Sequence, residues 1–293
     1  MKRVGIITVK TLVCGLIFFV GTILGGLVAS AAGFPIPAMP AGTDTATRAG
    51  YLLLASLGIG GLLAYLASRL SGNFLLKWLT LSLFGWVVYS LSTYIEAAIY
   101  TTFSSASLYK VVMDLIAFLA SSAAAVILFR ARSPHNTRET LSRFSFLGWA
   151  WRIVLAWTAF PVIYLSFGKL VEPFVIDYYR QGLFELTAPG WEQIISAQML
   201  RSLLFLGVCL AVITLWNRSR TELWIGCSVA LYLLVGGFYM LQAYWFPVGF
   251  RMIHCPEMFA DSITYIGLLT LCFMPKEARN VSQTAPLTMA KQN

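Results

Sequence analysis

The sequence predicts an all-α integral membrane protein, a polytopic bundle of about eight transmembrane helices. Charged residues make up only 11% of the chain, whereas soluble domains carry about 25%. Hydrophobic residues make up 58%, and uncharged runs alternate with short charged patches. A run of about 20 apolar residues spans a bilayer core as a helix. Helices are expected because an open chain in lipid must satisfy its own backbone hydrogen bonds.

Eight apolar runs are long enough to cross a bilayer at about 1.5 Å per residue. In chain order they cover residues 11–33, 50–68, 78–103, 111–129, 146–167, 194–216, 223–246 and 253–273. With their connections they form one predicted membrane domain, residues 1–274. The connection 168–193 mixes apolar and charged residues, which predicts an interfacial amphipathic helix or a lid. The polar stretch 275–293 is expected to be a disordered cytoplasmic tail.

The first run has a second interpretation, a cleaved signal peptide. Lys2 and Arg3 precede it, and Ala-Ser-Ala at residues 29–31 resembles a cleavage site. The run is longer than the usual apolar core of a signal peptide and continues apolar beyond residue 31. We therefore expect a retained span; cleavage would leave seven spans.

The distribution of basic residues predicts the orientation. Fourteen lysines and arginines fall on the side that holds both termini, against five on the opposite side. Positive charge gathers on the cytoplasmic side of a membrane protein. Both termini are therefore predicted to be cytoplasmic, in a plasma or inner membrane. Because the basic residues cluster at span ends, the net charge of +9 indicates contact with the bilayer surface and not nucleic acid.

A basic cytoplasmic linker, residues 131–145, divides the spans into two candidate four-helix halves, 1–130 and 146–274. Trp78 precedes Glu96 by eighteen residues, and Trp224 precedes Gln242 by the same interval. Each half would hold an even number of spans, so the two copies would share one orientation. Such repeats are related by an axis along the membrane normal. The sequence leaves this duplication open.

Ionisable side chains inside apolar spans are costly in lipid and mark candidate sites. They gather toward the outer ends of four spans. The candidate substrate- or ion-binding residues are Glu96, Asp114, Arg201, Arg251, His254, Glu257 and Asp261. His254, Glu257 and Asp261 share one helical face, which must point into the bundle. Arg201 lies about 10 Å deep, so we expect it to contact one of the carboxylates.

Three functions remain open. Four carboxylates against two arginines give the cluster a formal charge of −2, which favours a small-solute or ion carrier coupled to protons or cations. A membrane-embedded enzyme would use His254, Glu257, Asp261 and Glu96 as a weak ligand set for a divalent metal ion. In a non-catalytic scaffold or partner subunit the cluster would be structural. The sequence names no catalytic residue, cofactor or oligomeric state, and its five cysteines are expected to be free.

Overall fold

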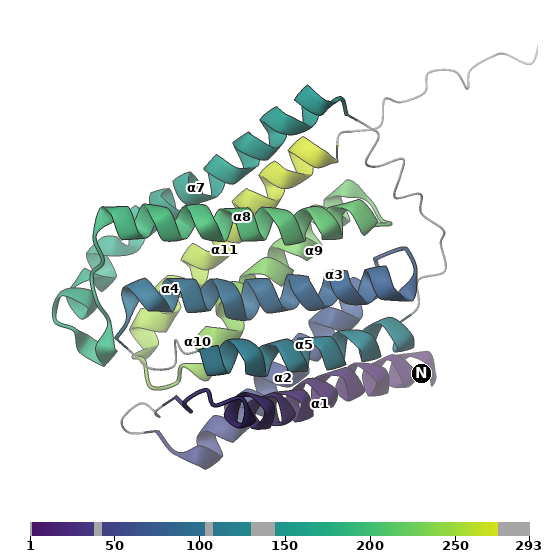
Figure 1. Ribbon diagram of the computed structural model, residues 1–293, viewed down its shortest axis with the longest axis horizontal. Coiled ribbons are helices and arrows are strands. Elements are labelled where there is room, and N and C mark those ends of the chain that lie inside the picture. Colours follow the sequence, from purple (N-terminus) through teal and green to yellow (C-terminus); the bar gives the residue numbers. More distant parts are fainter. Residues whose placement is uncertain (1, 38–42, 103–107, 130–143, 275–293) are drawn as a thin grey trace, which may run out of the picture.

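In the computed structural model, residues 2–37, 43–102, 108–129 and 144–274 are described, and they form a bundle of long helices (Figure 1). Within these ranges there is no strand, only two isolated β-bridges. The predicted all-α polytopic bundle is confirmed. The tail 275–293 and all of the predicted linker except its last two residues lie outside the described ranges.

The first four spans are α1 (Lys2–Ala31), α2 (Thr45–Ala67), a segment made of α3 (Phe74–Trp86), the π-helix η1 (Val87–Leu91) and α4 (Ser92–Tyr100), and α5 (Leu108–Leu128). Glycines allow α1 to pack closely on α2 and α5. A Cβ at Gly25 would lie 2.3 Å from the carbonyl oxygen of Met113, and one at Gly60 would lie 2.2 Å from the backbone nitrogen of Gly15. Cleavage after residue 31 would remove this interface; retention of the first span stays a prediction.

The remaining elements are α7 (Phe146–Arg180), the 3-10 helix η3 (Leu183–Glu185), α8 (Trp191–Leu215), α9 (Arg220–Tyr232), the π-helix η4 (Leu233–Gly237), α10 (Phe238–Gln242) and α11 (Val248–Phe273). The segment 168–193 begins as a continuation of the fifth span, and whether it lies at the interface or acts as a lid stays a prediction. Helix α7 has 35 residues and is about 52 Å long, so it continues through residues 168–180. The turns of α7 beyond residue 167 are stabilised by apolar packing, because Val175 is buried beside Phe250 of α11.

Seven helical segments of the described chain are long and apolar enough to cross a membrane, and they match the first seven predicted spans. Helix α11 is not among them, although its 26 residues are sufficient for crossing. It carries Arg251, His254, Glu257 and Asp261, which lower its hydropathy. It packs against α7 and α9 along the bundle. The eighth crossing therefore stays a prediction.

Successive spans run in opposite directions, which gives the bundle two distinct ends (Figure 1). The terminal end holds the N-terminal end of α1 and the α2–α3 and α8–α9 connections. The distal end holds the last turns of α1, α4, α7 and α10 and the first turns of α2, α5, α8 and α11. At the distal end Thr101 and Leu186 form a β-bridge, and at the terminal end Leu70 and Trp216 form another.

Trp78 and Trp224 occupy matching positions in the third and seventh spans. The indole Nε1 of Trp78 donates to the carbonyl of Leu119 on α5 at 2.8 Å. That of Trp224 donates to the carbonyl of Ile263 on α11 at 2.9 Å. In each span a π-helix begins nine residues after the tryptophan. The same interhelical hydrogen bond and the same helical irregularity thus recur at the same interval.

The residues before each tryptophan also correspond. Asn73 and Ser219, each five residues earlier, cap their helices by accepting a hydrogen bond from a backbone N–H. Leu70 and Trp216, each eight residues earlier, are the two residues that bridge each other at the terminal end. These correspondences go beyond the tryptophan spacing visible in the sequence.

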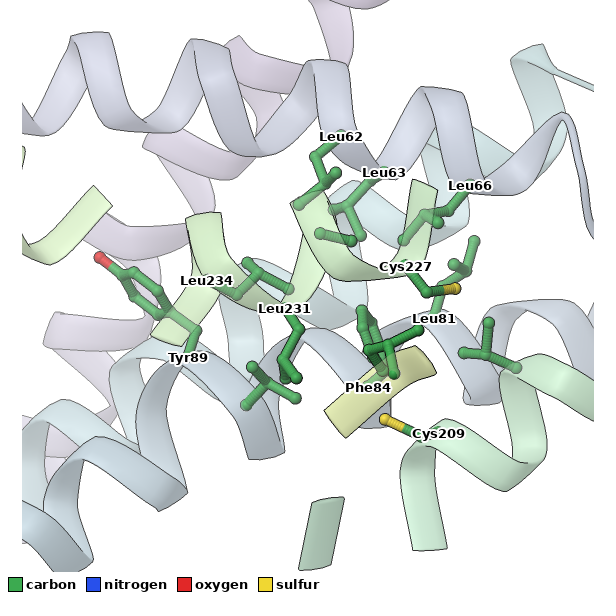
Figure 2. Packing of buried hydrophobic residues seen from close by; sticks show 14 of the residues in the cluster. Leu62, Leu63, Leu66, Leu81, Phe84, Tyr89, Cys209, Cys227, Leu231 and Leu234 are labelled. Atoms are coloured by element: carbon green, nitrogen blue, oxygen red, sulfur yellow. The ribbon is translucent and has the colours of Figure 1, made fainter. Parts of the chain in front are cut away.

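The main apolar core lies where the early and late spans meet (Figure 2). The side chains labelled there are Leu62, Leu63, Leu66, Leu81, Phe84, Tyr89, Cys209, Cys227, Leu231 and Leu234. Between membrane helices close packing, more than removal of surface from water, stabilises such contacts. All five cysteines are free, as expected. Tyr89 lies at the edge of the cluster with its hydroxyl directed away from the leucines.

Candidate functional site

A cavity of about 800 Å³ lies inside the bundle and extends to the distal end. All seven segments that can cross the membrane, and α11, contribute to its wall. Five of the predicted site residues line it, namely Glu96, Arg201, His254, Glu257 and Asp261. The fold therefore brings together most of the ionisable residues that the sequence marked as candidates.

Arg201 on α8 is only 2% exposed, and three neighbours hold its guanidinium. Its Nη2 lies 3.0 Å from Oε2 of Glu96. Its Nε donates to Oγ of Ser92, and its Nη1 donates to Oε1 of Gln198, both at 2.8 Å. The predicted contact between Arg201 and a carboxylate is confirmed, and it joins α8 to α4.

Two tyrosines complete this network and were not anticipated from the sequence. The hydroxyl of Tyr164 on α7 lies 3.0 Å from Oε1 of Glu96 and 3.3 Å from the hydroxyl of Tyr100. A buried tyrosine needs a partner for its polar tip, so a tyrosine within the apolar run of α7 was the available signal. Glu96 remains 29% exposed and faces the cavity between Arg201 and Tyr164.

The face of α11 predicted from the sequence points into the cavity. Nδ1 of His254 lies 2.6 Å from Oε2 of Glu257, one turn along the same helix. Asp261 follows one turn further and is 7% exposed. Its Oδ1 is buried and has no hydrogen-bond partner among the described residues, and the same holds for Nε2 of His254 and Oγ1 of Thr93.

These three unsatisfied atoms belong to residues of the cavity wall. A buried polar atom without a partner costs about 1–3 kcal/mol. A polar ligand in the cavity would recover part of that free energy by forming the missing hydrogen bonds. In the Arg201 network the guanidinium has its partners, and one further buried atom, Nε2 of Gln198, lacks one among the described residues.

Asp114 does not join this group. Its Oδ2 lies 2.7 Å from Nζ of Lys110, one turn earlier on α5, and it does not line the cavity, whereas Lys110 does. Lys110 also lies over the rings of Tyr89 and Tyr239, at 4.9 and 5.2 Å from their centroids. The sequence assigned Lys110 to a connection because α5 was expected to begin at residue 111. Its spacing of four residues from Asp114 was the signal for this pair.

Arg251 also lies outside the cavity wall. Its Nη1 donates to the carbonyl of Met240 on α10 at 3.3 Å, so it ties the start of α11 to the seventh span. Since α11 begins at Val248 and not at residue 253, Arg251 is already within the helix. Its contact fits a role in helix packing.

The four residues considered as metal ligands do not form a metal-binding group. Among the described residues, no three His, Cys, Asp or Glu side chains are placed to hold an ion together. Glu96 is occupied by Arg201, and Glu257 contacts only His254 of the intended set. The geometry therefore gives the metal-dependent alternative no support.

The charge of the site is unevenly shared. Glu96 and Asp114 each contact a basic side chain, whereas Glu257 contacts His254 and Asp261 has no ion pair within the described part of the chain. The α11 face of the cavity consequently carries the carboxylates that lack a lysine or arginine partner. That face favours a cation over an anion.

Fold and site together define an integral, multi-pass membrane protein with a charged cavity enclosed by its helices. Comparison of the chain with protein-family models, curated proteins and solved structures finds no match. The function is therefore argued from the cavity itself.

Proposed function

We propose that the protein is a carrier that moves a small solute or ion across a plasma or inner membrane, coupled to protons or another cation. The observation that carries this proposal is Asp261. It is 7% exposed, it lines the cavity, and its Oδ1 has no partner among the described residues. A purely structural carboxylate would be expected to have a basic partner, as Asp114 has in Lys110.

The position of the cavity supports transport. Ionisable residues within membrane spans commonly mark the paths of substrates, ions and protons. Here they line a volume of about 800 Å³ that reaches the distal end of the bundle. Basic residues favour the opposite, terminal end, so the proposed orientation places the termini in the cytoplasm and the distal end outside.

We further propose that residues 1–130 and 146–274 are two copies of one four-helix unit. The matched tryptophans, caps and π-helices support this relation. The two π-helices contact each other, and each contributes a residue to the cavity wall, Ser90 and Val235. Short π-helical segments are frequent at functional sites, and carriers built from repeats bind substrate between them. Rocking of the halves would expose the cavity to either side in turn.

Alternating access can be tested without knowing the substrate. In a variant whose five cysteines are replaced, Ala97→Cys would place one thiol on the cavity wall. A membrane-impermeant thiol reagent is applied to right-side-out and to inside-out vesicles. We expect labelling from both sides. Cysteines at Gln181 and Asn217, at the distal and terminal ends, serve as controls that react from one side only. Labelling of residue 97 from one side only would overturn the carrier proposal and leave a receptor or a structural pocket.

A further inference from the structure

We infer that the cavity binds an amphipathic organic cation, with its ammonium group on Asp261 and its apolar body against the aromatic part of the wall. This inference rests on the proposed carrier function, because it names the class of solute for that same cavity.

The size of the cavity argues against a bare ion as its only occupant. A proton or a single metal cation occupies a small fraction of about 800 Å³. Pockets for small organic molecules measure about 300–1,000 Å³ and are mostly apolar with a few placed polar groups. This cavity fits that description, because the ionisable residues of its wall are joined by many apolar ones.

The charge of the ligand follows from which wall groups are free. Arg201 and Lys110 already contact the carboxylates of Glu96 and Asp114, whereas Arg48, the third basic residue of the wall, is exposed on the first turn of α2. An anionic ligand would have to compete with those carboxylates. Asp261 offers a carboxylate oxygen without a partner, more than nine-tenths of its surface being buried. A protonated amine supplies both the positive charge and the N–H donors that this oxygen lacks.

The rest of the wall suits the body of such a ligand. Phe160, Phe205, Phe250 and Tyr179 line the cavity together with Asp261. Aromatic faces attract cations that lie within about 6 Å of the ring centroid. They also provide flat apolar surface for an alkyl or aryl group. The wall therefore combines one open carboxylate with the aromatic surface that organic cations prefer.

The same carboxylate would also couple transport to protons. A proton and an ammonium group cannot both occupy Oδ1 of Asp261, so binding of one would release the other. Exchange of an organic cation for a proton follows from this competition. The charged and titratable groups that share the cavity wall with Asp261, and would modulate its proton binding, are several tyrosines together with Arg48, Glu96, Lys110, Arg201, His254 and Glu257.

Binding to the purified protein tests the ligand class directly. The probes are 4-phenylbutylamine, 4-phenylbutanol and 4-phenylbutyrate, which share one body and differ in charge. In calorimetric titrations in detergent we expect the amine to bind about ten- to hundredfold more tightly than the alcohol, and the carboxylate to bind most weakly. Equal affinities, or preference for the carboxylate, would overturn the inference without any variant.

Asp261→Asn then locates the contact. It should reduce the affinity for the amine to that for the alcohol, about ten- to hundredfold. Asp177→Asn, the same substitution at an exposed position of α7 away from the cavity wall, should leave both affinities unchanged. Retention of the amine preference in folded Asp261→Asn would refute the assignment of Asp261.

The outcome is distinguishable from that of the labelling experiment. Amine binding that depends on Asp261, together with labelling from one side only, would keep the organic-cation site and reject the carrier. Labelling from both sides without amine binding would keep the carrier and reject this class of solute.

Discussion

Glu96→Gln should destabilise the bundle, because Glu96 is the carboxylate in contact with the buried guanidinium of Arg201. The other two partners of Arg201, Ser92 and Gln198, are neutral. Removing one partner of a buried ion pair costs about 3–5 kcal/mol. Glu96 is 29% exposed toward the cavity, so water there screens part of the uncompensated charge. We therefore expect the free energy of unfolding to fall by about 2–3 kcal/mol.

Glu222→Gln is the matched control. Glu222 pairs with Arg69 across two spans at the terminal end, in a pair whose side chains are 29% and 32% exposed. Pairs at this level of exposure contribute about 0–1 kcal/mol. The same chemical change should therefore lower the free energy of unfolding much less here, because neither charge is deeply buried.

Reversible unfolding in mixed detergent and SDS micelles, followed by circular dichroism, measures the free energy of unfolding that each of the two variants loses. The double variant Glu96→Gln/Arg201→Gln should lose less free energy of unfolding than the two single variants lose together. The second change removes the charge that the first change leaves unpaired. Equal losses for Glu96→Gln and Glu222→Gln would refute the argument from burial.

Three further predictions concern topology and packing. A reporter enzyme active only in the cytoplasm should be active when fused after Arg218 and inactive after Gln181; the opposite pattern would overturn the proposed orientation. Gly25→Leu should sharply lower yield and thermal stability, because its Cβ would lie 2.3 Å from a backbone oxygen of α5; wild-type stability would show that α1 is not packed there. Trp78→Phe and Trp224→Phe should each lower the free energy of unfolding by about 1 kcal/mol, since each removes one interhelical hydrogen bond. Unequal losses in chemical unfolding would argue against equivalent roles in the two halves.

The positions of the spans could be predicted because bilayer thickness sets the length of an apolar run. The ends of the helices could not, because packing outside the apolar run decides them. Helix α7 continues past residue 167 since Val175 finds an apolar partner in Phe250. Helix α5 begins early enough to include Lys110, which an analysis of hydropathy assigns to a connection. The π-helices leave no trace in composition and appear only in the backbone.

The candidate site could be predicted as a group of residues, but not in its pairings. Each ionisable residue in a span could be identified alone, because exposing a charged side chain to lipid is unfavourable whatever its neighbours are. Helical spacing correctly placed His254 and Glu257 on one face. Which carboxylate Arg201 contacts depends on which helices lie side by side. Because α4 lies beside α8, Glu96 pairs with Arg201, whereas Asp114 pairs with Lys110 on its own helix. Contacts within one helix were therefore accessible to sequence reasoning, whereas for Arg201 only the kind of partner on another helix could be predicted and not which residue it is.

The most direct test of the central claim combines Asp261→Asn with the Ala97→Cys labelling experiment, at acidic and alkaline pH. If Asp261 binds the coupled proton or cation, protonation shifts the balance between the two access states. In the otherwise wild-type protein the ratio of labelling from the two sides should then change with pH. With Asp261→Asn the ratio should no longer depend on pH, while the free energy of unfolding stays within about 1 kcal/mol of the wild-type value. A pH-dependent ratio that survives the substitution, or a large loss of stability on substitution, would contradict the account and make Asp261 a structural residue.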